Sequence, residues 1–188
     1  MRKLSAGVLI TALAIGALAV CAPTASARTT TAADPIGDAS FQVNYALSRQ
    51  VFAAGIGWYA GNPAGGTLIE PGKLGFGLAV VSMKDSRAVI GGTINFTRGD
   101  PSYLRTVVLS DIVFDFATAK VSARVYATDT DLGTVNIFTL THVKKSGTST
   151  TAFTLKLTKK AAAALNEGLN SSMFAAGMRI GSGDLYTN

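Results

Sequence analysis

Short runs in which apolar and polar residues alternate dominate the chain beyond residue 40 and constrain its fold more than any other feature. Val121, Ala123 and Val125, for example, alternate with more polar neighbours. A period of two places successive side chains on opposite faces of a half-buried strand. The same pattern recurs over residues 41–47, 76–82, 88–96, 112–116, 135–138 and 153–157. Turn-forming residues separate these runs, so we expect a mainly β fold, an antiparallel sandwich or an open barrel.

One or two short helices are expected at the edge of this sheet. Thr158 precedes an alanine-rich segment over residues 159–169 and has the character of an N-cap residue. A second helix is predicted over residues 49–54, with Ser48 as its cap and Gly55 at its end. Residues 41–47 are predicted to form the strand before that helix, with Tyr45 on the strand.

The N-terminus has the three parts of a secretory signal peptide. Positive charge at Arg2 and Lys3 is followed by an uncharged apolar run and then by Ala25-Ser26-Ala27, a small-residue cleavage signature. We therefore predict a signal peptide over residues 1–27, a flexible tether over 28–39 and a single domain over 40–188. The domain is expected to work outside the cell. It is long enough to form one sizeable core, and we expect no membrane span in it.

The single cysteine leaves an alternative for processing. Leu18-Ala19-Val20-Cys21 resembles a lipobox, which would acylate Cys21. Val20 is bulky where that motif normally has a small residue, so cleavage after Ala27 is the favoured prediction. In that case no cysteine survives, and a disulfide framework is excluded although the compartment would permit one.

The residues of common catalytic and metal sites are mostly absent. His142 is the only histidine, so a His/Cys zinc site is excluded and a Ser-His-Asp triad would have to use it. Its place two residues after Leu140 predicts a structural role on one strand face, with Phe138. Residues 129–133 resemble part of a calcium loop but are better explained as a hairpin turn. We expect no enzyme and no metal site; a hydrolase built on aspartates and His142 is the alternative.

Positive charge predicts a surface that contacts anionic partners. The chain carries a formal net charge of +6. No motif of interleaved aromatic and basic residues accompanies it, so nucleic acid is not an expected partner. Cell-wall polymers or surface proteins are expected instead. The candidate contact residues are Lys144, Lys145, Lys156, Lys159 and Lys160.

Several motifs, taken in their order along the chain, resemble the HtaA-type domains of bacterial surface proteins. Ser40-Phe41-Gln42-Val43-Asn44-Tyr45 resembles their S-F-x-x-Y segment, and residues 92–97 resemble their G-x-v-x-F-t strand. The remaining matches are residues 109–115 with 121–125, residues 155–158 with 161–165, and residues 176–178. Together they span most of residues 40–182.

This resemblance implies a β-rich extracellular domain, and the characterised members of the family bind haem and pass it between surface proteins. Tyr45 matches the tyrosine that holds the iron. The family histidine has no counterpart, because Arg98 or Gly99 stands in its place. Arg98 would favour the charged tyrosinate, and Phe96 and Trp58 would supply aromatic walls. The alternative is a related surface domain that binds no haem.

Overall fold

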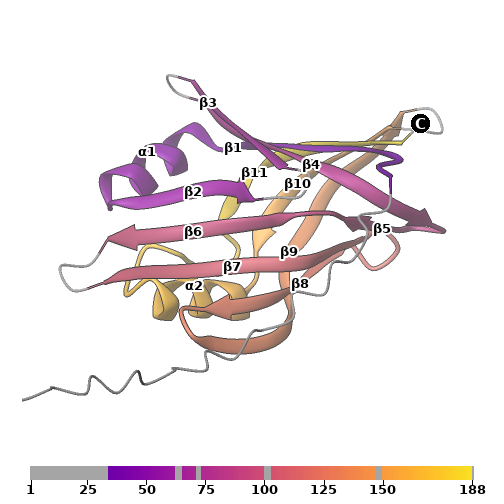
Figure 1. The fold of residues 1–188 in the computed structure, drawn as a ribbon. Coiled ribbons are helices and arrows are strands. Elements are labelled where there is room, and N and C mark those ends of the chain that lie inside the picture. Colours follow the sequence, from indigo (N-terminus) through magenta and orange to yellow (C-terminus); the bar gives the residue numbers. More distant parts are fainter. Residues whose placement is uncertain (1–33, 62–64, 71–72, 100–102, 147–149, 188) are drawn as a thin grey trace, which may run out of the picture. The chain divides into compact units, whose positions relative to one another are not determined.

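A computed structural model describes residues 34–61, 65–70, 73–99, 103–146 and 150–187, and the predicted signal peptide and Cys21 lie outside these residues. The chain order of the elements is shown in Figure 1. They are β1 (Gly37–Val43), α1 (Tyr45–Ala53), β2 (Ile56–Gly61), β3 (Gly65–Glu70), β4 (Lys73–Lys84), β5 (Arg87–Ile90), β6 (Thr93–Gly99), β7 (Leu104–Asp115), β8 (Lys120–Ala127), β9 (Thr130–Ser146), β10 (Thr150–Leu157), α2 (Lys159–Gly168) and β11 (Arg179–Thr187).

Eight of the described strands form a closed antiparallel barrel. Around the ring the order is β7, β5, β4, β1, β11, β10, β9 and β8, and β8 pairs with β7 again. The prediction of a mainly β antiparallel fold is confirmed, but the sheet is neither a sandwich nor an open barrel. Closure depends on the pairing of the first strand, β1, with the last, β11. Local alternation carries no information about that long-range pairing, which removes the exposed edges that both strands would otherwise have.

Glycines on β11 allow β1 and β11 to approach closely. A Cβ atom on Gly181 would run into the backbone oxygen of Gln42, and one on Gly183 would run into that of Ser40. The same atom on Gly183 would also meet the ring of Phe153 at 3.0 Å. Glycine in a strand interior is typical of such close backbone approaches. The absence of these side chains therefore helps the ring to close at its first and last strands.

The barrel interior is filled by the inward residues of the alternating runs. Phe41, Phe114 and Phe153 meet there, with ring centroids between 5.2 and 5.9 Å apart. α2 contacts β7, β8 and β9 and buries Ala161 and Leu165. The sequence prediction for this helix is confirmed, because the Thr158 hydroxyl accepts a hydrogen bond from the backbone N–H of Ala161 at 3.2 Å.

The first helix begins earlier than predicted. β1 ends at Val43, Asn44 is the N-cap residue and Tyr45 is the first residue of α1. Ser48 is therefore inside the helix, where its hydroxyl donates to the backbone oxygen of Tyr45 at 2.9 Å. The prediction of a strand over residues 41–47 was wrong beyond Val43. Leu47 is apolar because the helix buries it, and it continued the alternating pattern of the strand only by coincidence.

The barrel also begins before the predicted domain boundary. β1 starts at Gly37, so residues 37–39, which were assigned to the tether, pair with both β4 and β11. Within the described part of the chain, no helix combines the length and the apolar character needed to cross a membrane.

Candidate functional site

One side of α1 presents aromatic and cationic side chains outward. Tyr45, Arg49 and Phe52 follow one another at spacings of four and three residues, which places them on the same side of a helix. Tyr45 is 54% exposed and Phe52 is 45% exposed, whereas Leu47 and Val51 on the other side are buried. The Arg49 guanidinium lies over the Tyr45 ring, 5.9 Å from its centroid. We call Tyr45, Arg49 and Phe52 the α1 face.

A hollow of about 200 Å³ lies beside Tyr45, where β1 leads into α1. Its walls come from residues 42–45 and, on β11, from Arg179, Gly181 and Ser182. The pairing of Val43 with Gly181 and a 2.8 Å hydrogen bond from the Asn44 N–H to the Ile180 oxygen fix these walls. Arg179 is thus a second guanidinium near the Tyr45 phenol. Two cations make this end of α1 suited to an anionic group.

A larger groove, with a volume of about 650 Å³, crosses the outer face of five neighbouring strands. These strands are β9, β10, β11, β1 and β4, and the groove shares Gln42 and Ser182 with the hollow beside Tyr45. Its lining includes large apolar residues, namely Phe41, Leu74, Phe76 and Phe153, beside polar and very small ones. Those that point outward include Ser40, Gln42, Gly77, His142, Lys144, Thr154, Ser182 and Asp184. We call this feature the groove.

The two aromatic residues predicted to wall a haem site lie in the core instead. Trp58 is 4% exposed and Phe96 is 1% exposed. Their ring centroids are 4.7 Å apart, and Trp58 also contacts Phe76 at 5.3 Å. These rings join β2, β6 and β4 in the interior. They do not line the hollow beside Tyr45.

The Arg98 side chain donates hydrogen bonds at the C-terminal end of α2. Its Nη1 donates to the backbone oxygen of Leu169 at 3.2 Å and also to that of Asn170. The last carbonyl groups of a helix lack partners within the helix and carry partial negative charge, so a guanidinium stabilises them. Arg98 also lines a separate hollow with Ala54, beyond the far end of α1. The nine residues of α1 span about 13 Å, so Tyr45 and Arg98 lie near opposite ends of this helix.

The spacing around Tyr45 differs from the family pattern by one residue. Three residues separate Phe41 from Tyr45, whereas S-F-x-x-Y has two. Asn44 occupies the position at the family spacing, and its side chain accepts the capping hydrogen bond from the Leu47 N–H at 3.3 Å. The motif spacing alone therefore does not match Tyr45 to the family tyrosine, and its role as an iron ligand stays a prediction.

The five predicted contact lysines are all exposed, on two strands and one helix. Lys144 and Lys145 lie on β9, Lys156 lies on β10, and the other two begin α2. Lys144 lines the groove, and Lys156 is paired with Arg179 across β10 and β11. Positive charge therefore reaches both the groove and the hollow beside Tyr45.

His142 does not lie on the strand face of Phe138 and Leu140, where the sequence placed it. Its φ of 53° marks a local irregularity in β9, close to a register shift against β10. Phe138 and Leu140 remain buried, but this irregularity interrupts the alternation and leaves His142 exposed on the groove. A bulge of this kind redirects a side chain.

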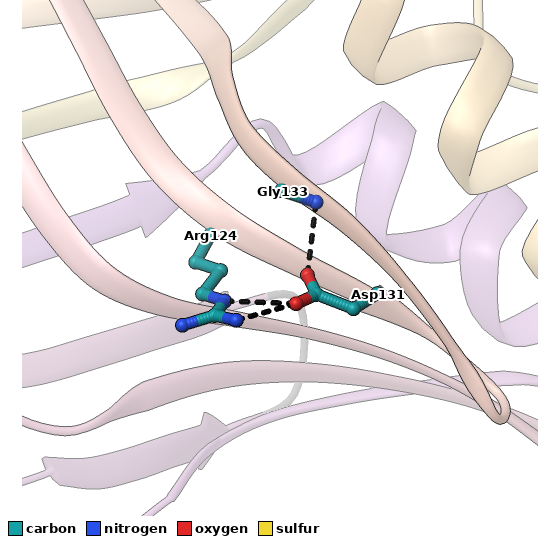
Figure 2. A network of polar contacts seen from close by, with 3 residues as sticks. All are labelled: Arg124, Asp131 and Gly133. Carbon is teal, nitrogen blue, oxygen red and sulfur yellow. Dashed lines mark hydrogen bonds and ion pairs between the residues drawn. The ribbon is translucent and has the colours of Figure 1, made fainter.

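Thr128 and Asp129 form a hairpin turn between β8 and β9, and residues 130–133 of the segment resembling a calcium loop already belong to β9. Figure 2 shows the polar contacts of Asp131 in this segment. Asp131 accepts hydrogen bonds from Arg124 Nε at 3.1 Å and from the Gly133 N–H at 2.9 Å. The hydrogen bond from Arg124, followed by that from Gly133, lowers the pKa of the Asp131 carboxyl below its ordinary value. Among the described residues, no three His, Cys, Asp or Glu side chains are grouped to hold a metal ion.

Sequence reasoning missed Arg49, Phe52 and the groove, and it did not place Arg179 beside Tyr45. Recognition of Asn44 as the helix cap would have revealed the spacing of the α1 face. Arg179 and the groove residues come together only through the pairing of strands distant in sequence, so no local pattern indicates them.

No family model and no curated relative matches the chain. Two solved structures from Corynebacterium glutamicum share its fold. The C-terminal domain of HtaA has a TM-score of 0.56 and 16% identity, over 81% of this chain and 97% of that one. The heme binding protein HtaB has a TM-score of 0.59 and 15% identity, over 80% of this chain and 91% of that one. The chain thus has the HtaA-type fold that its motifs predicted.

Proposed function

We propose that this chain is a secreted, non-catalytic binding domain and that it holds haem at the α1 face. One observation carries the proposal. The exposed Tyr45 has the Arg49 guanidinium over its ring and lines the same hollow as Arg179, at one end of α1. The similarity in fold to HtaB, a heme binding protein, supports haem as the ligand.

The donor set at this end of α1 fits haem. Haem would bring an iron that can take a tyrosine oxygen as a ligand, together with two carboxylate groups. Tyr45 would supply the oxygen, and the guanidiniums of Arg49 and Arg179 match carboxylates in charge and geometry. Phe52 would offer apolar contact. The predicted partners Trp58 and Phe96 do not belong to this set because they are buried.

The fold holds Tyr45 in position before any ligand arrives. Its backbone oxygen accepts from Ser48, and Asn44 caps the turn that Tyr45 begins. Arg49 lies one helical turn further on, and Arg179 is held by β11. Anchoring on a helix and a strand restricts these three side chains more than a loop would, which reduces the ordering cost of binding.

Titration of the purified protein with haemin, followed by absorption spectroscopy, tests the proposal. We expect a saturable shift of the Soret band and a loss of affinity of at least tenfold in Tyr45→Phe. Tyr103→Phe is the matched control. Tyr103 is 47% exposed, and the Arg105 guanidinium lies over its ring, 4.7 Å from the ring centroid. Equal effects of the two variants, or no saturable shift, would refute the haem site.

A haem-free surface domain is the second candidate. The exposed Lys144 and Lys156, with Arg179, favour contact with anionic wall polymers. Co-sedimentation with purified cell walls, lost at high salt and unaffected by haemin, would support this candidate instead.

The secreted state has its own test. The intact mass of the protein recovered from the culture would show whether it begins at Arg28 or at an acylated Cys21. A mass that still includes residues 1–20 would contradict both forms of processing.

A further inference from the structure

We propose that the groove is a second ligand site and that it binds an oligosaccharide. The groove adjoins the hollow beside Tyr45 but extends away from it, across the outer face of the barrel. Nothing in the haem proposal uses its polar side chains, apart from the shared wall formed by Gln42 and Ser182.

Strand pairing arranges the groove residues in two rows. The first runs from β9 to β4 through Lys144, Ala152, Asp184, Ser40 and Gly77. The second runs beside it through Thr154, Ser182, Gln42 and Gly75. Five strands spaced at about 4.8 Å give a length of roughly 19 Å. The groove is therefore long enough for several sugar units.

The polar groups of the groove are available to a ligand. The side chains of Gln42, Asp184 and Lys144 have no hydrogen bond or ion pair with any described residue. Ser40 and Gln42 are exposed on the groove as well, so a hydroxyl and an amide group also face solvent there.

Glycine keeps part of the groove open. A Cβ atom built on Gly77 meets nothing within 4 Å, so the space above this strand is free. The backbone of Gly77 does not have a positive φ, so a residue with a side chain can adopt its conformation. A larger side chain at residue 77 would therefore occupy the groove without a clash in the strand.

The chemistry of the lining favours a sugar chain over other ligands. The two rows contain hydroxyl, amide, carboxylate and ammonium groups, which suits a ligand rich in both donors and acceptors. Asp184, in the middle of the groove, disfavours a polyanion. Tyr186, exposed two residues further along the same face of β11, offers a flat surface for a sugar ring. A peptide cannot add as a strand, because β1 already pairs on both sides.

Amide NMR of the full chain titrated with an N-acetylglucosamine hexamer tests the site. We expect saturable shifts at Ser40, Gly77 and Asp184, and an affinity at least tenfold lower in Gly77→Leu. Gly99→Leu is the matched control, because a Cβ on Gly99 also meets nothing within 4 Å and Gly99 does not line the groove. Tyr45→Phe should leave the shifts unchanged, which separates this site from the haem site.

Three results would overturn the proposal. One is a lack of saturable shifts with the hexamer. Another is equal binding by Gly77→Leu and Gly99→Leu. The third is binding that disappears in about 1 M salt, where the screening length is about 3 Å, because that result would assign the contact to the lysines and to a charged ligand.

Discussion

The two helices follow the same local design but serve the barrel differently. Each follows a strand and begins with a side-chain cap, Asn44 for α1 and Thr158 for α2. α2 buries five of its ten residues against the barrel, and Arg98 binds the carbonyl groups at its C-terminal end. α1 buries three of its nine residues and leaves Tyr45, Arg49 and Phe52 outward. Figure 1 shows α1 beside β2 and α2 beneath β7.

This difference suggests a division of roles. A helix whose apolar face and both ends are satisfied contributes mainly to folding. A helix that leaves an aromatic and cationic face outward contributes surface for recognition. Substitutions in α2 should therefore change stability, whereas substitutions on the α1 face should change binding.

The largest expected effect is at Leu165, which α2 buries against the barrel. Leu165→Ala should lower the free energy of unfolding by about 2–5 kcal/mol, since it leaves a cavity. Phe52→Ala on the α1 face should change it by no more than about 0.5 kcal/mol. Urea denaturation followed by circular dichroism gives both values. Similar decreases in the free energy of unfolding in the two variants would contradict the proposed difference between the helices.

Arg98 tests the contrast at a residue that the sequence assigned to the ligand site. Arg98→Ala should cost about 1–3 kcal/mol, because the carbonyl groups of Leu169 and Asn170 lose a charged donor. Haemin affinity should stay unchanged. Arg49→Ala, its counterpart on the α1 face, should show the reverse, with weaker haemin binding at unchanged stability. If a stably folded Arg98→Ala variant bound haemin more weakly, Arg98 would have to be assigned to the haem site, as the sequence predicted.

The two N-caps provide a finer comparison. Thr158→Ala should cost about 0.5–2 kcal/mol, because the hydroxyl both caps α2 and donates to the Asn136 oxygen at 2.6 Å. Asn44→Ala should cost less, because its capping hydrogen bond is longer, at 3.3 Å. Denaturant midpoints of the two variants measure the difference. A larger loss for Asn44→Ala would show that α1 matters more to folding than its exposure indicates.

The smallest effect concerns pH and lies away from both helices. The pKa of the Asp131 carboxyl is lowered in the folded protein by the hydrogen bond from Arg124. The stabilisation is therefore present above the ordinary carboxyl pKa near 4 and is lost as pH falls through the lower, folded value. Both side chains are exposed, so the effect should be small. Urea midpoints at pH 5 and pH 2 should differ more for the wild type than for Asp131→Asn.

The sequence predicts α2 and most of the strands because their signals are local. Val121, Ala123 and Val125 alternate in sequence and are all buried, and Thr158 is recognisable as a cap before an alanine-rich run. The start of α1 was misplaced because Phe41, Val43 and Leu47 fit one alternating pattern across the junction between strand and helix. His142 was misplaced because a bulge leaves no clear signal in one sequence.

The candidate sites depend on contacts that local patterns do not contain. Arg179 meets Tyr45 only because β11 pairs with β1. The groove depends likewise on four strand pairings between five strands. Trp58 and Phe96 appeared suitable for a ligand wall because their residue types fit, but burial removes them from the surface.

The most direct test of the central claim is to locate the haemin iron with amide NMR. Ferric iron broadens the signals of nearby nuclei, so its position can be read from the residues that are lost. With haemin bound, we predict loss of the signals of Asn44, Tyr45, Arg49 and Arg179, while those of Ala161 and Leu165 in α2 persist. Loss of the α2 signals with those of the α1 face intact, or uniform broadening without saturation, would contradict the account.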